Sequence, residues 1–151
     1  MLPEPAFESR SVVKLSGVSE RELRHWADRG IVVPAIADAV GRPGVRRKYS
    51  FDNLVQAAII KELLRQGINL HEAGRMLMVY KNDSLVRHSP GRLYLIIEGG
   101  TAQVLEMKGP PTKARLAKLL DPHMAQDSFS IVAVHQLKER LIAGVKAMQR
   151  E

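Results

Sequence analysis

Basic side chains that could bind a polyanion gather in two short stretches of this sequence. In SGVSERELRHWADRG (16–30), Arg21, Arg24 and His25 lie close together. A guanidinium can donate two parallel hydrogen bonds to a phosphate or to the edge of a guanine. These residue types therefore predict contact with a phosphate-rich polymer. In GRPGVRRKYS (41–50), four basic residues occur without an acid: Arg42, Arg46, Arg47 and Lys48.

The overall charge agrees with that prediction. The 151 residues carry 23 Lys and Arg against 16 Asp and Glu, which is a formal net charge of +7. A basic domain favours a polyanionic partner, usually nucleic acid, although many basic proteins bind no anion. The length corresponds to one or two small domains, enough for a hydrophobic core without staples.

Enzyme and metal chemistry find no support in the pattern of reactive side chains. The chain has no cysteine, and its five histidines do not pair at helical spacings of three or four residues. Paired carboxylates and a phosphate-binding loop of the strand–loop–helix type are also missing from the sequence. We therefore expect no catalytic residue, no metal site and no cofactor.

Targeting signals are equally missing from the printed sequence. The first residues, MLPEPAFESR, hold two acids and two prolines and lack the apolar run of a signal peptide. No apolar run approaches the length that a membrane span requires. We expect a cytoplasmic protein without a membrane partner.

Two short helices must position the first basic stretch. After a loose arm over 1–8, a helix is expected from a cap at Ser9 to about Leu15, and Gly17 breaks it. Ser19 then opens a second helix, and its spacing to Glu22 is that of a capping box. Gly30 is expected to end this helix in a left-handed conformation. The arrangement predicts a helix-turn-helix.

The second helix has two distinct faces at 100° per residue. Leu23, Trp26 and Ala27 share the inward side. On its own the helix fits a solvated surface as well as a contact surface, since Glu20 and Arg24 have the spacing of an ordinary ion pair. The capped helix before it and the basic Gly/Pro hairpin after it favour a contact surface. The outward side holds Arg21, Arg24, His25 and Asp28.

The remaining chain alternates helical and strand patterns. Val32 and Val33 could pair with 45–49 across the Gly/Pro turn as a hairpin. Helices are expected over 51–66 and from a cap at Asn69 to about residue 80, and 81–91 is a linker. A β-hairpin turning at 99–100 and a short helix over 112–120 follow. FSIVAV predicts a strand before a terminal helix, although one continuous helix over 129–149 fits the period too.

Several motifs together resemble the MerR family of transcriptional regulators. VVKLSGVSERELRHWADRGIVVP is similar to the family's helix-turn-helix, with LRHW in the positions of its "LRyY" pattern. RRKYSFDNLVQAAIIKELLRQGINLHEAGRML resembles its wing and the two following helices. His25 replaces the commoner first aromatic residue, and the wing is longer and more basic than the minimal form. The resemblance covers about residues 10–78.

The resemblance implies a role in DNA binding for named residues. Ser19, Arg21, Arg24 and His25 would lie at the major groove or its phosphates, with Trp26 partly in the core and partly at the backbone. Arg47 would contact the DNA backbone, and Tyr49 would anchor the wing. The full expected DNA-binding set is Lys14, Ser19, Arg21, Arg24, His25, Trp26, Arg42, Arg46, Arg47, Lys48 and Tyr49.

The C-terminal part departs from the long dimer helix of many MerR-type regulators. YLIIEGGTAQVLE and FSIVAVHQLKERL are more similar to an actinobacterial MerR-type subgroup. We therefore expect an α+β protein: a winged helix-turn-helix of four helices and a β-wing (9–80), a linker (81–91) and a small α/β dimerisation or sensor domain (92–151). An apolar stripe in its last helix could pack on its own hairpin or form a dimer interface: Val134, Leu137, Leu141, Val145 and Met148.

The function that these expectations favour is a sequence-specific transcription regulator at the nucleoid. Its partners would be double-stranded DNA, a second copy of the chain and RNA polymerase at a promoter, with no effector indicated. Two alternatives stay open. One is an architectural or excisionase-like DNA binder, and the other is a protein-interaction module that acts through the C-terminal domain.

Overall fold

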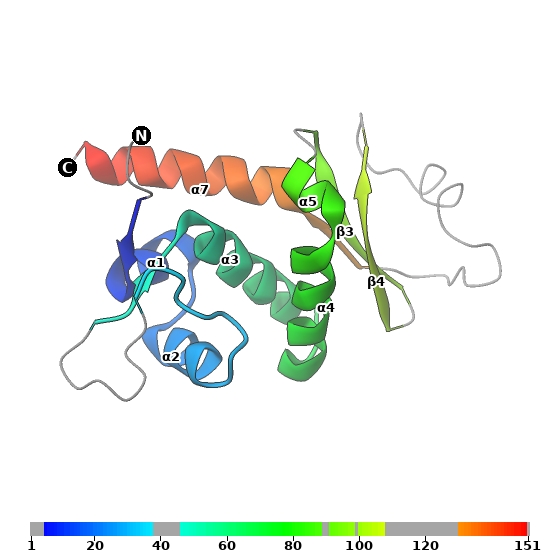
Figure 1. Ribbon diagram of the computed structural model, residues 1–151, viewed down its shortest axis with the longest axis horizontal. Coiled ribbons are helices and arrows are strands. Elements are labelled where there is room, and N and C mark those ends of the chain that lie inside the picture. Colours follow the sequence, from blue (N-terminus) through cyan, green and yellow to red (C-terminus); the bar gives the residue numbers. More distant parts are fainter. Residues whose placement is uncertain (1–4, 38–45, 89–90, 99, 108–129, 151) are drawn as a thin grey trace. The chain divides into compact units, whose positions relative to one another are not determined.

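A computed structural model describes residues 5–37, 46–88, 91–98, 100–107 and 130–150 (Figure 1). The chain forms two compact units, Met1–Glu62 with Leu137–Glu151 and Leu63–Gln136. It passes from one unit to the other within two helices, α3 (Phe51–Arg65) and α7 (Val134–Gln149). The predicted α+β class is confirmed. The predicted domains, 9–80 and 92–151, were divided where the hydrophobic period of the sequence changes and not by spatial contact. That division stays a prediction.

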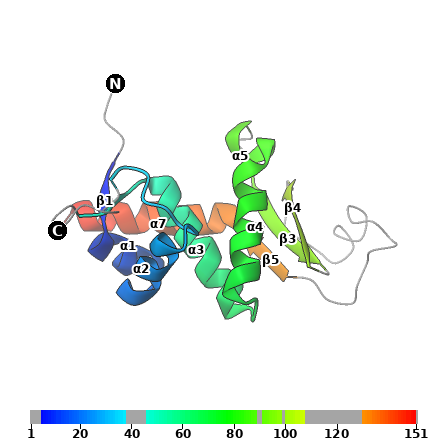
Figure 2. The ribbon, with the colours of Figure 1, turned by 60° about the horizontal axis from the view of Figure 1, so that its bottom comes forward.

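The first unit is built on α1 (Ser9–Ser16) and α2 (Glu20–Asp28), which a tight turn joins (Figures 1 and 2). Gly17 ends α1 with a φ of 76°, a left-handed conformation that a Cβ would strain. The predicted pair of helices is confirmed, with one correction. Ser9 is the first helical residue. Glu8, whose backbone is extended, holds the cap position, and its side chain makes no capping hydrogen bond.

A small antiparallel ladder pairs the N-terminal segment with the wing. Strand β1 (Phe7–Glu8) runs against β2 (Lys48–Tyr49), with Phe7 opposite Tyr49. The expectation of a loose arm over 1–8 is therefore wrong at its end. The expected hairpin is also shifted, because Ala37 rather than Val32 or Val33 bridges to Lys48. A local sequence pattern can predict pairing only between neighbouring segments. Because β1 lies far from β2 in the sequence, their pairing was not predicted.

Apolar side chains from every helix of the first unit are buried together with β2. A Cβ at Gly144 of α7 would lie 2.8 Å from Leu15 Cδ2, so α7 packs closely on α1. Burial of each large apolar side chain contributes roughly 1.5–3 kcal/mol. The buried set includes Val12, Leu23, Trp26, Val32, Tyr49, Leu54, Ile59 and Leu141.

The second unit packs helices on a three-stranded antiparallel sheet of order β4-β3-β5. The strands are β3 (Leu93–Glu98), β4 (Thr101–Glu106) and β5 (Ser130–Ala133). All six residues of the central β3 are buried, so both faces of this strand are covered. Helix α4 (Leu70–Asn82) contacts β4, and its cap at Asn69 is confirmed by the bond that Glu72 N donates to Asn69 Oδ1.

Two further expectations are resolved in this unit. The β-hairpin predicted to turn at 99–100 is confirmed, since β3 and β4 pair from Glu98↔Thr101 onward. Strand followed by helix, not one continuous helix, is the arrangement at 130–149. The linker holds a short helix, α5 (Ser84–His88), which was not expected. The helix expected over 112–120 lies outside the described residues. Among the helices of the described segments, none combines the length and apolarity that crossing a bilayer demands.

Candidate nucleic-acid interface

The start of α2 is held by a complete capping box. Glu22 N donates to Ser19 Oγ at 3.0 Å, and Ser19 N donates to Glu22 Oε1 at 3.1 Å. Lys61 of α3 adds a bond from Nζ to Glu22 Oε1 at 3.2 Å. Burial raises the pKa of the Glu22 carboxyl, but the bonds from Ser19 and Lys61 outweigh it, so that pKa lies below its ordinary value. These bonds fix where α2 begins.

The two faces of α2 are those that the spacing predicts. Leu23 and Trp26 are each 1% exposed, and Ala27 is buried beside them. The core therefore fixes the rotation of α2 about its axis, and the opposite side faces solvent. The exposed side chains of α2 include Arg21, Arg24, His25 and Asp28.

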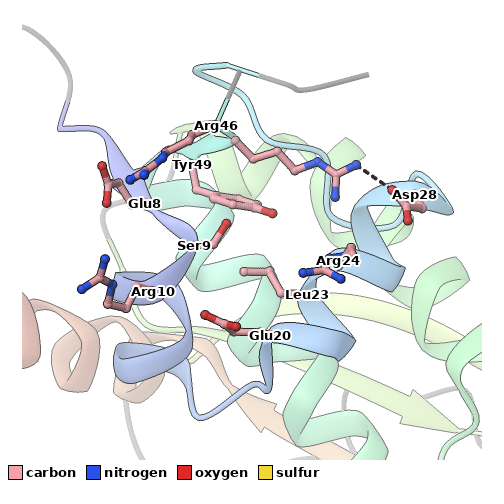
Figure 3. Close-up of a pocket in the computed structure, with 10 residues that line it drawn as sticks. Glu8, Ser9, Arg10, Glu20, Leu23, Arg24, Asp28, Arg46 and Tyr49 are labelled. Atoms are coloured by element: carbon pink, nitrogen blue, oxygen red, sulfur yellow. Dashed lines mark hydrogen bonds and ion pairs between the residues drawn. The ribbon is translucent and has the colours of Figure 1, made fainter. Parts of the chain in front are cut away.

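An open hollow of about 520 Å³ separates α2 from the wing and from the start of α1 (Figure 3). Leu23 and Tyr49 lie at its base, and both are buried. Sequence reasoning missed the contribution of Glu8 at the end of β1 and of Ser9 and Arg10 at the start of α1, because β1 pairs with β2 only in the folded chain. The charged residues around the hollow are Glu8, Arg10, Glu20, Arg24, Asp28, Arg46 and Arg47.

Side chains alternate along the base of the wing. Arg46 and Lys48 are exposed, Tyr49 is fully buried, and Arg47 is 17% exposed. Extended backbone places successive side chains on opposite sides, so Arg47 shares the inward side with Tyr49. Arg47 Nη2 lies 2.6 Å from Asp28 Oδ1 at the end of α2, where Figure 3 marks the pair with a dashed line.

Asn53 holds the loop that leads from α2 to the wing. Its Oδ1 accepts from Ala35 N at 2.9 Å and from Ser50 N at 3.0 Å, while its Nδ2 donates to Val33 O at 3.0 Å. This buried amide therefore joins the start of α3 to a loop that lies far from it in the sequence. The only sequence signal was the Ser50-x-x-Asn53 spacing, which resembles a capping box with Asn in place of Glu or Gln.

The other predicted DNA-binding residues fall into three groups. Lys14 and Ser19 lie on exposed positions of the helix-turn-helix. Trp26, predicted to be partly core, is buried, which leaves it almost no surface for the expected contact with the DNA backbone. Arg42 lies outside the described residues.

Within the described segments, no group of three or more acidic, histidine or cysteine side chains could hold a metal ion.

The predicted apolar stripe of the last helix is largely inside the chain. Val134, Leu137 and Leu141 are buried, while Val145 and Met148 are half-buried. Of the two alternatives for this stripe, packing within the chain accounts for its buried members. Ile142, a neighbour that was not predicted, is 43% exposed.

A capped second helix after a glycine turn defines a helix-turn-helix, and β2, paired with β1, lies in the same unit. Residues 7–78 match the family described as MerR HTH family regulatory protein. The motifs of this segment predicted the same family, so the match agrees with the sequence-based expectation for residues 7–78. The predicted likeness of the tail to an actinobacterial subgroup lies beyond the matched residues and stays a prediction.

Two kinds of relative are similar to this chain. An uncharacterized HTH-type transcriptional regulator of Mycobacterium tuberculosis is 38% identical over 65 residues, which is 43% of this chain and 28% of the relative. The HTH-type transcriptional regulator GlnR of Bacillus cereus is 29% identical over 80 residues, 53% of this chain and 58% of the relative. The chain thus spans less than a third of the mycobacterial relative and just over half of GlnR.

Proposed function

We propose that this protein is a transcriptional regulator that binds specific sites on double-stranded DNA. One observation carries the proposal: the core rotates α2 so that Arg21, Arg24 and His25 face solvent beside the exposed basic base of the wing. The relatives named above are described as transcriptional regulators, which supports the same class.

The recognition helix in this proposal is α2, inserted in the major groove. Helix-turn-helix proteins place the N-terminal residues of their second helix at the base edges. Arg21 and Arg24 supply guanidinium forks that suit guanine O6 and N7 or a flanking phosphate. His25 adds a ring that can donate or accept a hydrogen bond.

Backbone contacts come from the wing in this proposal. Arg46 and Lys48 are exposed on its base, and Arg42 stands in the same basic run. Each phosphate that they neutralise releases counterions, so the logarithm of affinity falls with the logarithm of salt concentration by about 0.9 per phosphate. Such contacts set the register of α2 on the duplex without reading sequence themselves.

The proposed assembly is a homodimer on a two-fold site. A symmetric pair doubles the contacts and reads two half-sites one helical turn apart. On α7, the exposed Ile142 with the half-buried Val145 and Met148 is the apolar surface open to such a partner. In this proposal the chain acts at the nucleoid. Where it binds a promoter, RNA polymerase is a further partner.

Genome-wide mapping of bound sites is the first test, followed by anisotropy titrations on the mapped duplex. Arg21→Ala and Arg24→Ala should each weaken binding to that duplex by about 5- to 150-fold, the loss expected for one base contact. Arg140→Ala is the matched control, an exposed arginine on α7. We expect it to bind as the parent does.

The outcomes separate the competing functions. A palindromic motif near promoters supports a regulator, whereas diffuse sites with equal affinity would favour an architectural or excisionase-like binder. If the parent chain binds no duplex at physiological salt, a protein-interaction module replaces the proposal. A chain that stays monomeric by light scattering, both free and on its site, would remove the dimer from it.

A further inference from the structure

The arginine expected to contact the DNA backbone is already engaged within the protein. Arg47 Nη2 lies 2.6 Å from Asp28 Oδ1, and the arginine side chain is 17% exposed while Asp28 is 57% exposed. A carboxylate at this distance occupies a face of the guanidinium that a phosphate would otherwise use. Arg47 therefore offers the DNA less surface than its neighbours Arg46 and Lys48, which are exposed.

The position of Asp28 is electrostatically unfavourable for a carboxylate without a partner. Asp28 is the last residue of α2, where the negative end of the helix dipole disfavours a carboxylate. It also lies on the side of α2 that faces a polyanion in the proposed function, where a negative charge opposes binding. The ion pair with Arg47 counters both effects.

The pair also connects two elements whose relative placement matters. Tyr49 anchors the wing in the core two residues after Arg47, and Asp28 belongs to the helix proposed to enter the major groove. The ion pair between Arg47 and Asp28 links the wing to α2. It therefore holds the exposed Arg46 and Lys48 at a set position relative to that helix. Phosphate contacts fix the register of a protein on the duplex, so a displaced wing would weaken binding.

From these observations we infer that Asp28 is a positioning residue for DNA binding, acting through Arg47 to hold the basic wing at its distance from the recognition helix. The inference rests on the proposed function and changes the role of Arg47 within it. Arg47 then links the wing to α2 rather than serving as a main phosphate ligand. Asp28 promotes DNA binding although it is an acid on the DNA-facing side.

The sign of one substitution distinguishes this role from simple charge. Removing an acid from a DNA-facing surface should strengthen binding if charge alone mattered. The positioning role predicts the reverse: Asp28→Ala weakens binding to the mapped duplex about two- to fivefold, the range of one exposed ion pair. It also lowers the salt slope by about 1, because a displaced wing loses a phosphate contact. Asp28→Glu should restore most of the affinity.

Glu20→Ala is the matched control, because Glu20 is another exposed acid at the same hollow, at the first residue of α2. We expect it to bind as tightly as the parent or more tightly. All variants are measured at a temperature where Trp26 fluorescence shows them folded, so that a loss of affinity is not a loss of fold.

A double-mutant cycle with Arg47→Ala completes the test. If Asp28 acts through Arg47, the double variant binds no more weakly than Arg47→Ala alone. Additive losses, or an Asp28→Ala variant that binds as tightly as the parent, would overturn the inference while leaving the proposed function intact. A parent chain that binds neither the mapped duplex nor a scrambled one of equal length would overturn the proposed function itself.

Discussion

Replacing Asn53 by alanine should destabilise the first unit more than any exposed cap residue can. The side chain is 3% exposed, and its amide makes four hydrogen bonds, to Ala35 N, Ser50 N, Val33 O and Gln56 Oε1. Alanine removes all of them. Ser50 N becomes a buried donor without an acceptor, because Ser50 is itself buried.

The magnitude follows from where each lost partner lies. A buried donor left unsatisfied costs about 1–3 kcal/mol. The backbone groups of Val33 and Ala35 belong to exposed residues and can bond to water, so each of these lost bonds costs only about 0.5–1 kcal/mol. We expect a total loss of about 2–5 kcal/mol in the free energy of unfolding, a large fraction of the stability of a small domain.

Urea denaturation followed by tryptophan fluorescence measures this loss directly. Trp26 is the only tryptophan, and it is buried in the same unit as Asn53. With a slope m of about 1–1.5 kcal/mol/M, the midpoint should fall by about 3 M without a change in m. Asn53→Asp keeps an acceptor for the N–H groups of Ala35 and Ser50, so it should lose less than the alanine variant.

Ser19→Ala is the control, because Ser19 is an exposed cap residue of the same unit and accepts one bond, from Glu22 N. Such a cap contributes about 1 kcal/mol. The reasoning about Asn53 fails if Asn53→Ala costs no more than Ser19→Ala, because the four bonds would then stabilise the fold no better than one exposed cap.

Two further substitutions test other parts of the first unit. Gly17→Val should cost about 1–3 kcal/mol, because φ is 76° there and a Cβ would meet no atom within 4 Å, so backbone strain alone acts. Gly17→Asn should recover part of the loss, and equal losses would contradict the strain argument. Glu22→Gln tests pH dependence. The lowered pKa of Glu22 means that its carboxylate stabilises the fold above its ordinary pKa, and this advantage over Gln should vanish as the pH falls through the folded-state value. A difference in urea midpoint that persists at acid pH would refute that linkage.

Local signals predicted the helix-turn-helix well. The spacing of Ser19 and Glu22 predicts a capping box, and the bonds between them are present. The inward side of α2 follows from 3.6-residue periodicity alone, because a helix with a narrow apolar stripe can bury only that stripe. The β-hairpin was predictable from a different local signal, since glycine at position 100 tolerates the φ of 82° found there.

Partners distant in sequence were not predictable from these patterns. No local feature indicates that Phe7 pairs with Tyr49, that Arg47 lies against Asp28, or that the terminal helix packs on α1 at Gly144. Patterning shows which face of an element is apolar but not which other face covers it. The same limit explains why the apolar stripe of α7 fitted both a partner chain and its own chain.

The sequence by itself determined the elements, the inward and outward sides of α2, and the basic character of the surface, because each depends on residues a few positions apart. Only the tertiary structure decided which charges meet. Arg47 and Lys48 are neighbours of the same charge, yet one is turned inward to Asp28 and the other outward to solvent. Burial of Tyr49 sets that alternation, and the packing of α2 brings Asp28 within reach of the arginine.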